Sequence, residues 1–233
     1  MKVKVYHLDL IEYQQAADLQ VRLAEEIAAG RQAPSLLLLE HPHVYTFGRQ
    51  GSLDNLIWDE AQLTARGVSI HHSDRGGDVT YHGPGQLVGY PVLPLGETGT
   101  LEYLRKLEET LICTLAEYGI PSKRVEGQTG VWVPALNGNA PSAKIASIGV
   151  RVDANRITRH GFALNVSPDM AYWQGIIACG LENQAKTSMA ELLDPSPAIG
   201  EVSAALIEHF ADVFDCQIEL AQLKKDADHE GEI

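Results

Sequence analysis

The chain has 233 residues, a length that suits one large domain. Its 18 Lys and Arg residues stand against 31 Asp and Glu residues, and the net charge of −13 disfavours broad binding to nucleic acid or to an anionic membrane. No apolar run approaches the roughly 18 residues of a membrane span, and the N-terminus turns polar too early for a signal peptide. Three scattered cysteines fit a reducing compartment, so we expect a cytoplasmic protein.

Helix and strand signals alternate along the first half of the chain. Residues 12–29 repeat apolar side chains with helical spacing and end at Gly30, and the leucine-rich run 35–39 predicts a buried strand. A short helix at 59–65 and strands at 68–72 and 87–93 follow. Pro91 in the last of these indicates an edge strand or a bulge.

The clearest helix of the second half runs from Thr100, as its N-cap, to Gly119, with Leu101, Leu104, Leu111 and Leu115 on one apolar face. We expect strands at 131–133, 145–152 and 157–166, the last two joined by a hairpin turn at 153–156, and a helix at 200–214. These elements predict an α/β fold with a mixed sheet. We expect one domain over 1–220 and a charged, flexible tail over 221–233.

The stretch from Arg75 to Gln86, RGGDVTYHGPGQ, is unusually rich in glycine and looks too irregular for a packed element. Its glycines would let backbone N–H groups approach a ligand, while Arg75 supplies planar donors and His82 a titratable ring. This composition is compatible with a ligand-binding loop and also with a simple turn between two strands that carries polar side chains.

Cys179 lies in the apolar run IIACGL, where a core thiol and a nucleophile are both possible. Lys144 opens an apolar strand, and most lysines in such a place are simply solvated. If the Lys144 ammonium reached Cys179, however, it would favour thiolate over thiol. Cys113 and Cys216 have no polar motif nearby, and we interpret both as structural.

Nine histidines raise the question of a metal site. Neither His41-Pro-His43 nor the His71-His72 pair has the spacing of a recognised zinc site, and no second ligand cluster accompanies them. We therefore expect no metal.

Six ordered blocks resemble the lipoyl (octanoyl) transferase family, which begins protein lipoylation. The blocks are EHPHVYTFGR (40–49), the 75–91 stretch ending in LVGYP, GVWV (130–133), KIASIG (144–149), HGFALNV (160–166) and ACG (178–180). The resemblance implies a fold like the catalytic domain of biotin and lipoate protein ligases: a mixed, largely antiparallel sheet flanked by helices, with a second small sheet. Two departures are an insertion at 134–143 and His43, where the family would have a smaller residue.

The same resemblance implies the roles of particular residues. Cys179 would carry the acyl group as a thioester, and Lys144 would lower the pKa of its thiol. Contacts to the acyl substrate would come from three segments: Arg75, Gly76, Gly77, Asp78, Val79, Thr80, Tyr81 and His82; Ser147, Ile148 and Gly149; and Gly161, Phe162 and Ala163.

The resemblance also implies the reaction and its partners. The donor would be octanoyl on the phosphopantetheine of acyl carrier protein, and the acceptor a lysine of the lipoyl domains of 2-oxoacid dehydrogenases or of the glycine-cleavage H protein. No further cofactor is implied, and we expect a monomer that binds neither nucleic acid nor membrane. Two alternatives are an ATP-dependent lipoate or biotin ligase, which would not need Cys179, and a non-catalytic protein that binds acyl carriers.

Overall fold

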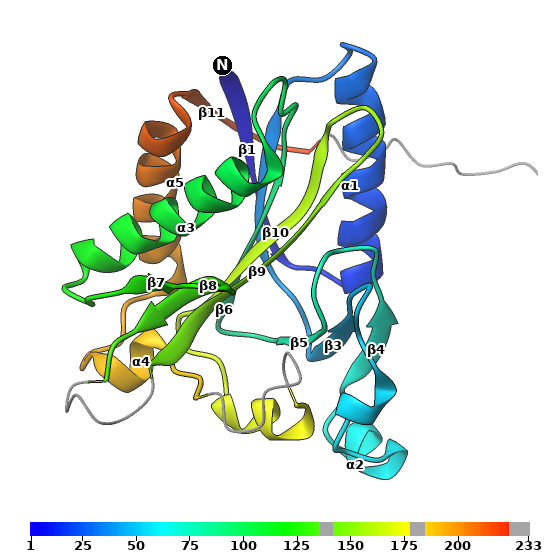
Figure 1. The fold of residues 1–233 in the computed structure, drawn as a ribbon, viewed down its shortest axis with the longest axis vertical. Coiled ribbons are helices and arrows are strands. Elements are labelled where there is room, and N and C mark those ends of the chain that lie inside the picture. The colour runs from blue at the N-terminus through cyan, green and yellow to red at the C-terminus, as the bar shows by residue number, and fades with distance from the viewer. Residues whose placement is uncertain (136–141, 178–184, 224–233) are drawn as a thin grey trace, which may run out of the picture.

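The large sheet dominates the molecule, which a computed structural model describes over residues 1–135, 142–177 and 185–223 (Figure 1). Within these ranges eight strands lie in the order β11-β1-β2-β6-β10-β9-β8-β7. Their bounds, in that order, are Gln217–Ala221, Lys2–Leu10, Ser35–Glu40, Gln86–Val92, Thr158–Asn165, Ala143–Val152, Gln128–Val133 and Lys123–Val125. β1 is parallel to β11 and β2, and the other neighbours are antiparallel.

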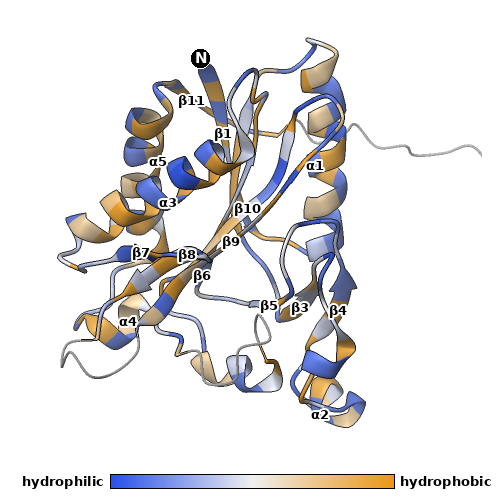
Figure 2. Ribbon diagram, in the orientation of Figure 1, coloured by the Kyte–Doolittle hydropathy of each residue, from blue (hydrophilic) through white to orange (hydrophobic). Residues whose placement is uncertain are grey.

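Helices cover both faces of this sheet. α1 (Tyr13–Ala28) packs on one face, where its Leu19, Leu23 and Ile27 join the buried side chains of β2 and β6. α3 (Thr100–Glu117) and α5 (Ile199–Phe214) contact each other and cover the other face. In Figure 2, hydrophilic and hydrophobic residues alternate around these helices, as expected where one side is buried.

A second sheet has the order β4-β3-β5 in the described chain. Its strands are Ser69–His72, Val44–Phe47 and Val79–His82, with β3 parallel to β4 and antiparallel to β5. An aromatic core of its own, with Tyr45, Trp58 and Trp173 among its members, holds it against α2 (Glu60–Ala65) and the 3₁₀ helix η2 (Met170–Gly175). The 3₁₀ helix η1 (Leu53–Asn55) has no buried residue. The short α4 covers Met189–Leu192. The predicted fold class, a mixed and largely antiparallel sheet plus a small one, is confirmed.

The structure corrects two predictions about α3. Its N-cap is Gly99, not Thr100. The buried line is Tyr103, Leu107, Leu111 and Leu115, because residues four apart stack on one face, whereas Leu101 is 65% exposed.

Pro91 is not in an edge strand, because β6 lies between β2 and β10. The paired register of β6 with β10 stops at Gly89, so no ladder bond needs the missing N–H of Pro91. Beyond that point the Thr158 hydroxyl donates to the Pro91 carbonyl at 2.7 Å and accepts from the Leu93 N–H at 2.9 Å.

The hairpin predicted at 153–156 is confirmed, since β9 and β10 pair antiparallel on either side of it. None of the helices in the described ranges is both long enough and apolar enough for a bilayer crossing. The proposed boundary between residues 220 and 221 stays a prediction.

Candidate active site

A cavity of about 520 Å³ opens where the small sheet meets β9 and β10. Its size suits a small or chain-like ligand. Of the substrate-contacting residues expected from the sequence, all but one line it: Arg75, Gly76, Gly77, Asp78, Val79, Thr80, His82, Ser147, Ile148, Gly149, Gly161, Phe162 and Ala163. The exception is Tyr81, which is fully buried on the other side of β5, in the aromatic core of the small sheet.

The glycine-rich stretch contains a packed element, contrary to the sequence interpretation. Val79–His82 forms β5, a strand short enough to fit between glycines and mostly buried. On its N-terminal side Gly77 has φ +88°, and the Gly76 N–H donates to the Val150 carbonyl at 2.9 Å. A Cβ on Gly48 would lie 2.3 Å from the Gly77 oxygen, so the loop and β3 can approach this closely only without a side chain there.

Arg75 connects the glycine-rich loop to β3 in the cavity wall. Its Nη2 donates to the Thr46 carbonyl at 2.5 Å and to the Thr46 hydroxyl at 3.0 Å, and its Nη1 donates to the Gly76 carbonyl at 3.0 Å. The side chain is 8% exposed. A buried guanidinium needs such acceptors, so part of its hydrogen-bonding capacity serves to fix the loop onto β3.

Lys144 is buried in the cavity wall at the start of β9, with 6% of its surface exposed, so it is not the solvated lysine of the alternative interpretation. Its Nζ donates to the Thr129 carbonyl at 3.1 Å and lies 4.6 Å from the centre of the Trp132 ring. These contacts suit a cation held in one position beside a cavity.

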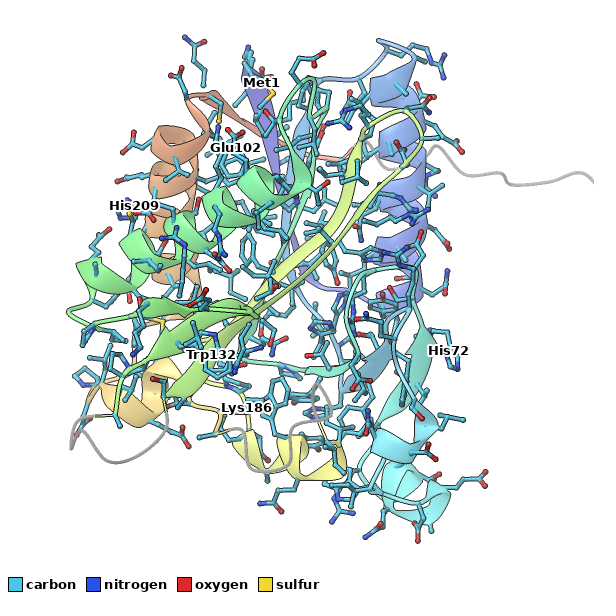
Figure 3. The ribbon with its side chains drawn as sticks, viewed as in Figure 1. Met1, His72, Glu102, Trp132, Lys186 and His209 are labelled. Carbon is cyan, nitrogen blue, oxygen red and sulfur yellow. The ribbon has the colours of Figure 1, made fainter. Side chains whose placement is uncertain are left out.

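The backbone of Lys144 is paired with the segment 185–187. Its N–H donates to the Ala185 carbonyl at 2.8 Å, and its carbonyl accepts from the Thr187 N–H at 3.0 Å. Lys186, which also lines the cavity, is thereby placed beside Lys144, and Figure 3 shows it below Trp132. Because the Lys144 N–H is already used, it is a poor candidate for binding an oxyanion.

Cys179 lies outside the described residues, as do 136–141 of the insertion. The chain on either side of 178–184 is well anchored. Before it, the Ile177 N–H donates to the Asn55 carbonyl at 2.8 Å, and after it comes the pairing of 185–187 with Lys144.

The other two cysteines do not line this cavity. Burial raises the pKa of both thiols, and Glu109 raises that of Cys113 further. Cys216 packs against the main core. Both features agree with the structural role predicted for them.

Several residues of the site carry no sequence signal. Tyr13, Thr129 and Lys186 line the cavity, yet each comes from a segment that no motif marks. His43, which the sequence marks only as unusual, stacks on Tyr172 with ring centres 3.8 Å apart.

At the α1 side of the cavity, Asp74 accepts from the Nε2–H of His160 at 2.7 Å and pairs with Arg159. These partners, the His160 hydrogen bond first, hold the pKa of Asp74 well below its usual range. Burial lowers the pKa of His160 in spite of the Asp74 carboxylate, which acts in the opposite direction. His160 has φ +57°, and its N–H leaves the sheet to donate to Gln20 Oε1 at 2.6 Å.

Across the described parts of the chain, no three metal-binding side chains come together. In the His41-Pro-His43 motif, both ring nitrogens of His41 have hydrogen-bond partners. Nδ1 bonds the Ile11 carbonyl at 2.7 Å and Nε2 bonds the Tyr90 hydroxyl at 2.8 Å.

Comparisons with known proteins place the chain in one family. The family model described as lipoyl protein ligase A/B catalytic domain matches residues 12–211. A protein named octanoyltransferase from Chloroflexus aggregans is 45% identical over 91% of this chain and 94% of its own length. One of the same name from Flavobacterium psychrophilum is 43% identical over 88% and 89%.

Solved structures show the same fold. A bipartite lipoate protein ligase from Thermoplasma acidophilum superposes with a TM-score of 0.73 at 16% identity, over 97% of this chain and 88% of that one. Biotin protein ligase from Aquifex aeolicus superposes with a TM-score of 0.50 at 10% identity, over 91% and 69%.

Proposed function

Because this chain belongs to the lipoyl protein ligase A/B catalytic-domain family and is an octanoyltransferase of lipoate biosynthesis, we propose that it works through a Cys179 thioester assisted by Lys144. The observation that carries the proposal is the Lys144 ammonium, buried in the cavity wall. Cys179 follows the anchored Ile177 by two residues, which span at most about 7 Å. The chain that follows returns to pair with Lys144 itself.

In the first step the Cys179 thiolate attacks the carbonyl carbon of the octanoyl thioester. The bond from that carbon to the carrier sulfur breaks, and the carrier leaves as a thiol after taking up one proton. The Lys144 ammonium favours the thiolate form of Cys179 by its charge, and each pKa unit of that effect is worth about 1.4 kcal/mol.

In the second step the uncharged lysine amine of the acceptor attacks the Cys179 thioester. An amide bond forms and the carbon–sulfur bond to Cys179 breaks. The departing thiolate takes up the proton lost by the amine, either directly or by way of Lys144, whose ammonium gives a proton to the thiolate and then regains one from the amine. A thioester is already activated, so this route needs no nucleotide.

The partners we propose are acyl carrier protein as donor and lipoyl domains, including the glycine-cleavage H protein, as acceptors, with no further cofactor. The Thermoplasma ligase is described together with its own E2 lipoyl domain, and this pairing supports an acceptor of the same class. We propose that the enzyme acts as a cytoplasmic monomer.

The basic side chains that we consider for docking acidic partners are Arg49, Lys123, Arg124, Arg151, Arg156 and Arg159, and of these only Arg49 lines the cavity. Arg124 pairs with Glu108 and Glu109, and Arg156 donates to the Gly96 and Thr98 carbonyls, so both are used internally. Arg49 is exposed and lines the cavity, which makes it the best placed of the candidates.

Intact-mass spectrometry after incubation with octanoyl-carrier, without ATP, tests the mechanism. The wild type and a Cys216→Ser control should gain a hydroxylamine-labile octanoyl group, and Cys179→Ser should gain none. A ligase would show no adduct in any variant and would require ATP, whereas a simple carrier-binding protein would give no thiol-labile adduct at all. Modification at Cys113 or Cys216 would overturn the assignment.

A further inference from the structure

We propose that Gln86 and Asn165 are positioning residues that hold His82 in one neutral tautomer, with the Nε2 lone pair facing the cavity as an acceptor for an N–H group of the bound substrates. The inference deepens the function proposed above and rests on it. The N–H group belongs either to an amide of the phosphopantetheine arm of the acyl carrier protein or to the lysine amine of the acceptor domain. The test below separates the two.

Asn165, Gln86 and His82 form a chain of buried hydrogen bonds, here called the relay, in which the direction of each bond is fixed. Asn165 faces the Thr187 carbonyl at 2.9 Å, and a carbonyl only accepts, so Asn165 must present its NH₂ there. Its oxygen then accepts from Gln86 Nε2 at 2.9 Å, and the same Gln86 NH₂ donates to the Tyr81 carbonyl at 3.3 Å. Gln86 is thereby left with Oε1 toward His82.

His82 Nδ1 lies 2.7 Å from this Gln86 oxygen. Because that oxygen can only accept, Nδ1 must carry the proton. A neutral imidazole carries one N–H, so Nε2 has a lone pair and no hydrogen. Among the described residues Nε2 has no hydrogen-bond partner, while the ring itself lines the cavity.

The surroundings keep His82 neutral. Burial lowers the pKa of His82 well below its usual value, and His41 and Arg75 act in the same direction, although the Gln86 hydrogen bond opposes them. The ring lies parallel to Tyr13, with centres 6.4 Å apart, and edge-on to His41 at 5.6 Å. These contacts restrict rotation of the ring, so the accepting edge stays toward the cavity.

The relay also reaches the other half of the site. The Thr187 carbonyl accepts from Asn165, while the Thr187 N–H donates to the Lys144 carbonyl at 3.0 Å. Gln86 and Asn165 are 1% and 3% exposed, so water does not compete for these bonds. His82 and Lys144 are therefore connected by one buried hydrogen-bond path.

The tautomer can be read directly by ¹⁵N NMR of the imidazole nitrogens in the free protein at neutral pH, with His82→Asn used for assignment. We expect a protonated Nδ1 and a bare Nε2 in the wild type. Gln86→Met removes the acceptor and should give a mixture of tautomers.

Single-turnover rates for the two half-reactions, from carrier to enzyme and from enzyme to acceptor, complete the test. Gln86→Met should slow at least one of them by roughly 10- to 100-fold, the size of effect seen when the outer hydrogen-bond partner of a metal-binding histidine is removed. If the first half-reaction slows, the N–H group that His82 accepts belongs to the phosphopantetheine arm. If the second slows, it belongs to the lysine amine of the acceptor.

Thr114→Val provides a matched control, since it removes a buried hydrogen bond of α3 far from the relay and should lower the melting temperature only. A protonated Nε2 in the wild type, or wild-type rates in Gln86→Met, would overturn the inference. Absence of any Cys179 thioester would instead refute the proposed function, because the NMR pattern does not depend on turnover.

Discussion

At the scale of single residues, the surroundings of each cysteine decide whether the pKa of its thiol is raised or lowered. Burial raises the pKa of Cys113 and of Cys216, so both are almost entirely thiols at neutral pH. If Lys144 stabilises the thiolate of Cys179, that cysteine alone should react quickly with an alkylating reagent.

We therefore expect iodoacetamide at neutral pH to label Cys179 at least about tenfold faster than either other cysteine, since one pKa unit changes the thiolate fraction roughly tenfold. Peptide mapping by mass spectrometry over time gives the three rates. Lys144→Met, which keeps the volume of the side chain and removes its charge, should slow Cys179 and leave the other two unchanged. Equal rates at all three cysteines would contradict the Cys179–Lys144 proposal.

At the scale of elements, the close approach of β8 to β9 places Lys144. Gly130 in β8 has φ +125°, and a Cβ there would lie 2.6 Å from the Ala146 oxygen and 3.3 Å from Lys144 Cε. Only glycine fits this contact without moving β9 or the lysine.

Gly130→Ala should therefore lower the free energy of unfolding by about 1–3 kcal/mol and also reduce octanoyl transfer. Gly119→Ala is the control, because Gly119 also has a positive φ, +71°, but a Cβ there meets nothing within 4 Å. It should cost about 1 kcal/mol and leave transfer unchanged. Urea unfolding and the single-turnover rate measure the two effects, and wild-type transfer in Gly130→Ala would show that this contact does not position Lys144.

The sequence predicts the long helices and the β9–β10 hairpin well, because their signals are local. It does not reveal β5, because Val79–His82 is short and stands between glycines. It also misses β1, although burial alternates over the first four residues of that strand, and the edge strands β7 and β11 are only three and five residues long.

In the site, too, the sequence predicts what lies within one segment and misses contacts between segments that the fold brings together. Motifs identify the Arg75–His82 stretch and Lys144, because each lies within one continuous run of recognisable residues. Lys186, which no motif marks, joins the site through its pairing with Lys144. Asn165 belongs to the HGFALNV block, but nothing in that block indicates that its side chain accepts from Gln86. No spacing along the chain predicts such contacts.

At the scale of the whole molecule, a net charge of −13 would repel an acidic carrier unless local cations guide docking. Arg49→Glu should slow the first half-reaction at low salt by roughly tenfold, and the difference should shrink at high salt because screening weakens the attraction. Arg22→Glu makes the same charge change on an exposed site of α1 that does not line the cavity. Stopped-flow rates at two salt concentrations compare them, and equal slowing by both variants would refute local docking at Arg49.

Stability of the whole fold should depend on pH through its buried histidines. Burial lowers the pKa of His41 to about 4, and it also lowers those of His82 and His160. The unfolded chain, with histidine pKa values near 6.5, binds more protons than the folded one over this range. The stabilisation is thus present above pH 6.5 and is lost as the pH falls toward 4.

His41 alone should contribute a decrease of about 2 kcal/mol in the free energy of unfolding between pH 7 and pH 5. His41→Asn keeps a donor for the Ile11 carbonyl but cannot titrate. The variant should be less stable at pH 7, since the Tyr90 hydroxyl loses its acceptor, yet its stability should fall less steeply with acid, by up to about 1.4 kcal/mol per pH unit. Urea unfolding at several pH values gives both slopes, and parallel curves would show that His41 is not the buried neutral group that its contacts indicate.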